Sequence, residues 1–186
     1  MKIGTKSILF GAHQFALHPA LLFVAWWRLY GFPADPRLWL AFVIHDLGYW
    51  GKPNMDGPEG ETHVEWAAGV MRRFFGDRWG DFCLYHSRFY SKRDGRHFSR
   101  LCVADKLVIV MEPSWLYLPR VWATGELWEY LKIAEGRSEG KYAGMRVDTR
   151  APRDWHRTMK AYVKAWVAEH RDGRADTWTP APTSQG

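Results

Sequence analysis

Residues 36–50 read PRLWLAFVIHDLGYW, and this stretch decides the fold. Asp35 suits a helix N-cap, and Pro36 follows at the first helical position, so a helix is expected to begin here. The side chains up to about Leu47 are apolar on nearly every side, which predicts a central, buried helix. This helix ends in the dipeptide His-Asp, and two ionisable groups in so apolar a segment are costly unless both are satisfied.

Helical patterns continue on both sides of this stretch, because apolar residues recur at spacings of three and four. Further helices are expected at residues 19–30, 62–75, 79–89, 99–111, 116–134 (with breaks at Pro119 and Gly125) and 154–170, with loops at 48–60, 91–97 and 135–153. No stretch has the alternating pattern of a strand. The sequence therefore predicts an all-α fold, with one helical bundle over residues 1–170 and a disordered polar tail over residues 171–186.

The composition fits one folded domain. The chain has 186 residues, of which 47% are apolar and 25% charged, and these values exclude a wholly disordered chain. Its 12 Trp residues carry more rigid apolar area than one core needs, so we expect some to line a pocket or a contact within a homo-oligomer. Cys83 and Cys102 cannot form a disulfide scaffold, and no CxxC pair indicates a structural zinc site.

Charge and hydropathy restrict the classes of partner. Residues 8–29 are apolar overall, but they include His13, His18 and Arg28, and ionisable groups at bilayer depth are expensive. We therefore expect no membrane span and, without a secretory signal pattern, a cytoplasmic protein. The net charge is +6, and its densest basic cluster, at residues 88–100, suits a phosphate on a small substrate or is a solvated basic face. A stable nucleic-acid complex is not expected, because that would favour a broad basic face.

Side chains of metal-ligand type accompany the His45–Asp46 pair. They lie on or beside other predicted helices, in apolar surroundings: His18, His63, His86 and Asp105. Imidazole and carboxylate groups together suit a divalent transition metal. The alternative is a buried, hydrogen-bonded pair of His45 and Asp46 that orders the core.

The order H…HD…H…H…D resembles the HD superfamily of metal-dependent phosphohydrolases. The resemblance covers residues 11–113, and its pieces are HPALLFVAWWRLYG (18–31), IHDLGYWGK (44–52), ETHVEWAAGVM (61–71), LYHSRFYSK (84–92) and CVADKL (102–107). It implies one ion held by His18, His45, Asp46 and Asp105. Members that are similar in the two additional histidines have dinuclear sites, which implies a second ion at His63 and His86 with Asp46 bridging. The ions would be Fe, Mn, Co, Ni or Zn.

Two features depart from the family pattern. His13 competes with His18 for the role of first ligand, because side chains five residues apart cannot both face one ion from an unbroken helix. His18 is preferred, since its helix then carries an apolar stripe, and His13 is then expected to contact the substrate or to cap the entry to the helix. Some nucleotidases of the superfamily carry a carboxylate one turn after the His of the pair, where this chain has Tyr49.

The catalytic base and the substrate contacts have to come from elsewhere. A base is expected from Asp56, Glu59 or Glu61, or the metal alone supplies hydroxide; our choice for the catalytic group is Asp46, Lys52 and Glu61. Cations for the phosphate are expected at Arg88, Lys92 and Arg93, with Lys106 as another, and Trp50 can stack on a nucleobase. The three histidines without metal-like context are expected at the surface or in loops: His97, His156 and His170.

The resemblance thus implies a metal-dependent phosphohydrolase that cleaves a nucleotide with a metal-activated water. The candidate substrates are a deoxynucleoside monophosphate, a deoxynucleoside triphosphate and a dinucleoside polyphosphate. The chain is similar both to bacterial diadenosine-tetraphosphate hydrolases and to small phage dATP triphosphohydrolases of this superfamily. Two other functions stay open: an oxygenase with a dinuclear iron site on the same fold, and a non-hydrolytic sensor that binds a nucleotide.

Overall fold

In the computed structural model, residues 1–135 and 149–172 are described, and all of their regular secondary structure is helical. This confirms the predicted all-α fold class. The helices in chain order are α1 (Ile3–Phe10), α2 (Leu17–Tyr30), α3 (Pro36–Ile44), the 3-10 helix η1 (Leu47–Tyr49), α4 (Pro58–Glu61), α5 (His63–Phe75), α6 (Asp77–Leu84), α7 (Arg88–Arg93), α8 (Arg100–Met111), α9 (Ser114–Thr124), α10 (Glu126–Glu135) and α11 (Pro152–His170).

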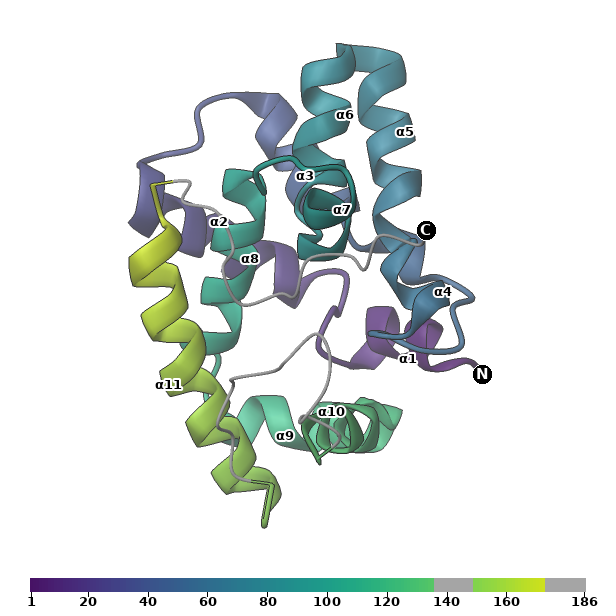
Figure 1. Cartoon of the computed structure of the whole chain (residues 1–186), viewed down its shortest axis with the longest axis vertical. Helices are drawn as coiled ribbons and strands as arrows, with labels where there is room; N and C mark the ends of the chain where they lie inside the picture. Colours follow the sequence, from purple (N-terminus) through teal and green to yellow (C-terminus); the bar gives the residue numbers. More distant parts are fainter. Residues whose placement is uncertain (136–148, 173–186) are drawn as a thin grey trace.

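The helices form two groups joined by α11. In Figure 1, α5 and α6 stand side by side at the top, with α2, α3 and α8 beside them, while α9 and α10 lie at the bottom. The long helix α11 runs down one edge and packs against both α8 and α9. The upper and lower groups therefore share α11 as a common wall.

The main core lies where α2, α3, α5, α6 and α8 meet. It includes Leu22, Ala41, Met71 and Leu101, each fully buried. The prediction that α3 is buried on nearly every side was wrong, because Val43 is 50% exposed and Trp39 48% exposed. Ala41, Phe42 and Ile44 are the buried residues of α3, so only one face of the helix meets the core.

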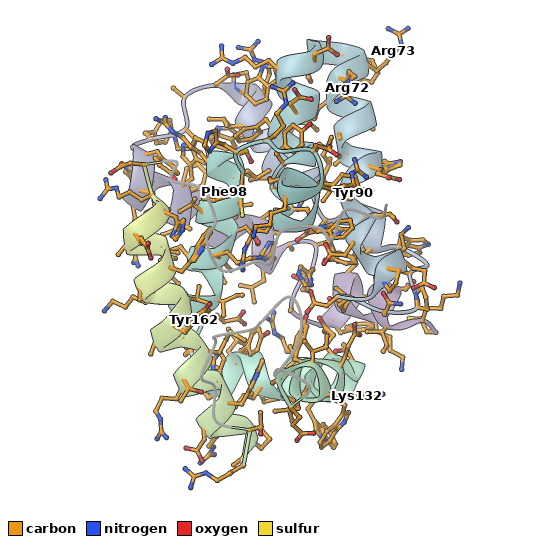
Figure 2. All side chains as sticks on the ribbon, viewed as in Figure 1. Arg72, Arg73, Tyr90, Phe98, Lys132 and Tyr162 are labelled. Atoms are coloured by element: carbon orange, nitrogen blue, oxygen red, sulfur yellow. The ribbon has the colours of Figure 1, made fainter. Side chains whose placement is uncertain are left out.

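A second core lies between α8 and α11, and a third between α9, α10 and α11. Phe98 and Tyr162 belong to the contact of α8 with α11, as Figure 2 shows, whereas Arg73 projects outward from the end of α5. Trp155 and Trp166 of α11 are buried in these two cores. The amphipathic helix predicted for residues 154–170 is thus confirmed, and its apolar face serves both groups of helices.

Helix boundaries differ from the sequence prediction at several places. Helix α1 was not predicted, and η1 and α4 overlap the loop predicted for residues 48–60. The helix predicted for residues 79–89 ends at Leu84, and α7 then includes the first three residues of the loop predicted for residues 91–97. Ser87 caps this new helix, since its hydroxyl accepts a hydrogen bond from the backbone N–H of Tyr90. Pro119 lies inside α9 rather than ending it, and the break comes at Gly125, whose φ of 91° favours glycine.

Two histidines that were expected at the surface are fully buried. His156 stacks on Tyr117 and its Nδ1 lies 2.9 Å from the hydroxyl of Ser114. His170 stacks on Trp166. The prediction was wrong for both residues, because an imidazole with a ring partner can fill a core position, whereas His97 is exposed as expected.

No helix in the described ranges is both long and apolar enough to cross a membrane. Most of the loop predicted for residues 135–153 and most of the tail predicted for residues 171–186 lie outside the described residues.

We expect the main core to dominate the stability of the metal-free chain. Leu22→Ala removes a fully buried side chain and should lower the free energy of unfolding by about 2–5 kcal/mol. The same substitution at Leu40, which is 37% exposed, should cost less than about 1 kcal/mol. Urea titrations of both variants in a chelator measure this, and equal losses would contradict the assignment of the core.

Candidate metal centre

Six buried side chains of metal-ligand type converge at one point inside the upper group of helices. They come from the first turn of α2, the junction of α3 with η1, the first residue of α5, the turn after α6 and the middle of α8: His18, His45, Asp46, His63, His86 and Asp105. Five segments that are far apart in the sequence therefore each present a ligand-type group to the same small volume.

The cluster divides into two groups that share one residue. The first group contains His18, His45, Asp46 and Asp105, and the second contains Asp46, His63 and His86. Within each group the ligand-type atoms lie within 4.8 Å of one another. Such a cluster can hold a divalent metal ion, and His18 rather than His13 is its first histidine.

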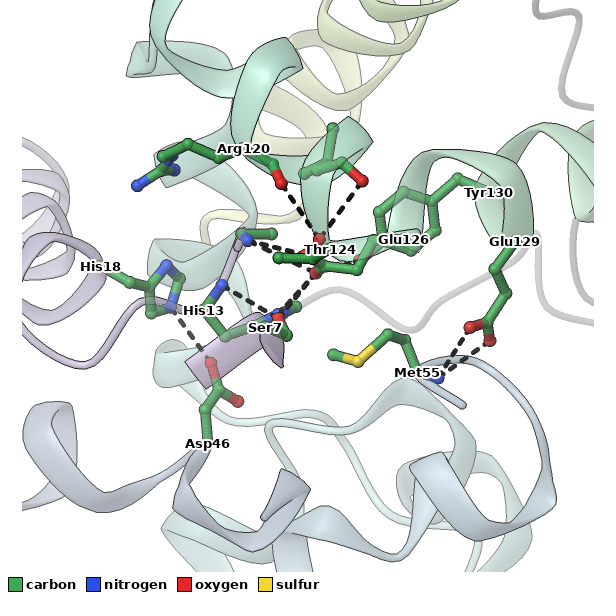
Figure 3. Close-up of polar contacts among 12 residues, drawn as sticks. Ser7, His13, His18, Asp46, Met55, Arg120, Thr124, Glu126, Glu129 and Tyr130 are labelled. Carbon is green, nitrogen blue, oxygen red and sulfur yellow. Dashed lines mark hydrogen bonds and ion pairs between the residues drawn. The ribbon is translucent and has the colours of Figure 1, made fainter. Parts of the chain in front are cut away.

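Asp46 points one carboxylate oxygen at each group. Its Oδ2 lies 3.2 Å from Nε2 of His18 and 3.0 Å from Nε2 of His45 (Figure 3 shows the first of these contacts). Its Oδ1 lies 3.6 Å from Nε2 of His63 and 3.5 Å from Nε2 of His86. Oδ2 is buried between these two ring nitrogens, so a cation bound there would compensate its charge.

The orientation of the imidazole rings fits metal binding. The Nδ1 atoms of His45, His63 and His86 lie 3.0, 2.7 and 2.5 Å from the backbone carbonyl oxygen three residues earlier. A carbonyl oxygen only accepts hydrogen bonds, so each Nδ1 carries the hydrogen and each neutral ring presents a bare Nε2. The Nε2 atoms of His63 and His86 lie 3.2 Å apart, so two lone pairs face each other when both rings are in the neutral Nδ1–H form. A cation bound to both nitrogens removes this repulsion.

Burial and charge set the protonation of the cluster. Burial lowers the pKa of His45 and, more strongly, that of His63, which keeps both rings neutral as metal ligands must be. Burial alone would raise the pKa of Asp46 and Asp105, but nearby histidines and a lysine outweigh it and hold both pKa values well below the usual range. For His18, burial is outweighed by hydrogen bonds to the two carboxylates, which raise its pKa to about 9.

A cavity of about 170 Å³ adjoins the cluster. Five residues of the cluster line it, all but His45, together with Asp56, Glu61, Arg88 and Lys106. The cavity also extends to apolar and aromatic side chains of α8 to α11, among them Tyr117 and Trp155. A polar end beside the cluster and an apolar end opposite can receive a molecule with one charged and one aromatic part.

The structure brings only some of the predicted substrate and catalytic residues to this cavity. Glu61 and Arg88 line it, whereas Lys52, Trp50, Lys92 and Arg93 do not. The amino group of Lys52 donates a hydrogen bond to Thr62, and Trp50 is 62% exposed. Arg93 pairs with Asp94, 2.6 Å away, and lies over the ring of Tyr90.

Several residues at the site had no clear signal in the sequence. The ring of Tyr49 stacks on that of His63 with centroids 3.9 Å apart, so Tyr49 supports a ligand-type ring. Glu129 of α10 accepts hydrogen bonds of 2.9 Å from the backbone N–H groups of Met55 and Asp56 and fixes the loop beside the cavity (Figure 3). An exposed-looking Glu in an amphipathic helix does not reveal such a contact.

Comparisons of the chain with protein-family models, with curated proteins and with solved structures find no match.

We expect the second group to hold an ion of its own. His63→Ala or His86→Ala should reduce the bound metal from about two ions per chain to about one, because each removes one nitrogen of a site that has only three ligand-type residues. Metal analysis of the purified variants measures this. His97→Ala, at an exposed histidine outside the cluster, is the matched control. Full metal content in both variants would mean that these rings are structural.

Metal binding to the first group should depend on pH. Below about pH 9 the metal-free protein holds a proton on His18, and an ion has to displace it. The affinity should therefore rise with pH, by about tenfold per unit between pH 6.5 and 8.5 if one proton is released. Chelator-competition titrations measure the slope, after correction for the protonation of the chelator. A slope of zero would show that His18 is already neutral.

Proposed function

We propose that this protein is a metal-dependent phosphohydrolase of the HD type that acts on a nucleotide. The observation that carries the proposal is the position of Asp46 between two groups of ligand-type side chains. The family resemblance implied these six residues in that division, and their convergence from five segments supports it. The proposed ligands are thus His18, His45, Asp46 and Asp105 for one ion, and Asp46, His63 and His86 for the other.

Two divalent ions at such a site supply Lewis acidity, which lowers the pKa of water and offsets charge on a phosphoryl group. The chain itself supplies two further cations at the cavity wall. Lys106 donates a hydrogen bond of 2.8 Å to Asp105, and this carboxylate helps to raise its pKa, so the amino group stays charged. Arg88 lies with its guanidinium carbon 5.4 Å from the ring centroid of Trp166. Both side chains are placed to bind non-transferring phosphate oxygens.

The rest of the substrate meets the apolar end of the cavity. The rings of Tyr130 and Trp155 are parallel within 12°, with centroids 5.8 Å apart, and Tyr117 lies beside them. Aromatic side chains of this kind favour a planar apolar group, so we place the nucleobase here rather than on the exposed Trp50. Glu61, whose carboxylate accepts a hydrogen bond from Ser87, remains our choice of acidic residue at the polar end.

The decisive experiment combines metal analysis with a phosphate-release screen. The purified protein, loaded in turn with Mn, Fe, Co, Ni or Zn, is incubated with deoxynucleoside monophosphates, deoxynucleoside triphosphates and dinucleoside polyphosphates. We expect release of phosphate or a nucleotide product only with metal, and none from Asp46→Asn. Oxygen consumption with iron and no phosphate release would favour the oxygenase, and nucleotide binding without turnover would favour the sensor.

Arg88→Lys tests the placement of the phosphate. A guanidinium holds a phosphate oxygen pair through two parallel hydrogen bonds, which an ammonium cannot copy. We expect kcat/KM to fall ten- to a hundredfold, which corresponds to the loss of about 1.5–3 kcal/mol for a charge-assisted hydrogen bond, with metal content unchanged. Arg93→Lys, at an exposed arginine outside the cavity, is the matched control. Equal small changes, under about twofold, would place the phosphate elsewhere.

A further inference from the structure

His13 lies beside the metal-ligand cluster but belongs to neither of its groups. It follows α1, lines the same cavity, and its ring centroid is 5.6 Å from that of His18 and 4.9 Å from that of Tyr49. Within the described chain, no residue forms a hydrogen bond with its Nε2. This side chain is therefore positioned to act on whatever the cavity holds.

The other ring nitrogen of His13 is held by a buried chain of polar groups (Figure 3). Its Nδ1 lies 2.9 Å from the hydroxyl oxygen of Ser7, and this hydroxyl donates a 2.6 Å hydrogen bond to Glu126. A serine hydroxyl has one hydrogen, which Glu126 accepts, so Ser7 must accept from Nδ1–H. The backbone N–H of His13 donates to the same oxygen at 3.4 Å. In the neutral ring, Nε2 is then a hydrogen-bond acceptor.

Hydrogen bonds on both carboxylate oxygens hold Glu126 in place. It is fully buried, and its oxygens accept from the hydroxyl of Thr124 at 2.5 Å and from the backbone N–H of Ala12 at 3.2 Å. Gly11 allows this approach, because a Cβ at that position would lie 1.9 Å from Glu126 Oε2. Burying the charge of Glu126 costs free energy of desolvation. The orientation of His13 is a function that would explain why a carboxylate is kept at this position.

We propose, on the basis of the proposed function, that His13 is the general base of the reaction, with Ser7 and Glu126 as positioning residues. Its Nε2 accepts a hydrogen bond from the attacking water. As the water oxygen forms its bond to phosphorus, the water proton passes to Nε2 and the bond from phosphorus to the leaving oxygen breaks. The leaving oxygen then takes the proton from Nε2, so the ring returns to its starting state. This assignment supplies the base that Tyr49 cannot provide from the position of the family carboxylate.

The first test is kinetic and uses the full-length, metal-loaded protein on the best substrate of the nucleotide screen. His13→Ala should lower kcat by about 10²–10⁴-fold, with KM within about twofold and metal content unchanged. Free imidazole should raise the kcat of this variant by at least about tenfold and leave the kcat of the wild type unchanged. His97→Ala, an exposed histidine, should keep full activity. A purely structural role for His13 would not give rescue by imidazole.

The second test examines the positioning residues by the tautomer of His13 as well as by kcat. Long-range ¹H–¹⁵N NMR spectra of the metal-free protein at pH 9 should show His13 as the Nδ1–H tautomer. Ser7→Ala should weaken this preference and lower kcat by about tenfold, because the next acceptor for Nδ1–H is Oε1 of Glu126, which lies 3.6 Å away. A His13 ring that carries its hydrogen on Nε2 in the wild type would overturn the proposal.

The two proposals fail in different ways. If the wild type releases phosphate and His13→Ala keeps its kcat, the general base is another group, and the phosphohydrolase assignment stands. If the metal-loaded wild type cleaves no nucleotide, the phosphohydrolase assignment fails and the role of His13 fails with it.

Discussion

The buried carboxylate of Asp46 is the constraint on which the rest of this structure depends. It is 6% exposed, and its two oxygens face imidazole groups on opposite sides. A buried charge is tolerated only where its surroundings compensate it, so the helices that carry the surrounding rings cannot shift without cost. The geometry of the cluster therefore depends on how the surrounding helices pack. These helices are α2, α3, α5, α6 and α8, which also form the main core.

The described part of the chain beyond α8 shapes a centre to which it contributes none of the six ligand-type residues. Two carboxylates at successive turns of α10 reach back to the first half: Glu126 to the residues after α1, and Glu129 to the loop before α4. Helices α9 to α11 also close the apolar end of the cavity. This explains why the predicted motifs end near residue 113 while the domain continues beyond it.

The parts that the sequence predicted well are those governed by local rules. The start of α3 follows from Asp35 and Pro36, and the ligand-type residues were recognised because a charged or imidazole group in an apolar helix needs a partner. No comparable rule predicts which residues far apart in the sequence will contact each other. Nothing near Glu126 in the sequence points to Ser7, which lies 119 residues away, and nothing near His156 indicates its stack with Tyr117.

Surface exposure was also hard to predict. The outer face of α3 is as apolar as its inner face, so periodicity could not show that Trp39 and Val43 remain exposed. Within the basic cluster at residues 88–100, the orientation of side chains depends on helix α7, in which Arg88 and Arg93 are five residues apart and so face different sides. A loop would have left both free to approach the same anion, whereas only Arg88 lines the cavity.

Because a cation would relieve the repulsion between His63 and His86, the stability of the folded chain should depend on bound metal. An ion that binds the folded chain and not the unfolded chain adds about 4 kcal/mol of stability when its free concentration is a thousand times Kd. Two such ions add about 8 kcal/mol, which is as large as the whole stability of an ordinary domain. If the cluster holds two ions in this way, the supply of metal would set the folded population, and a cell starved of the ion would lose the polypeptide to proteolysis.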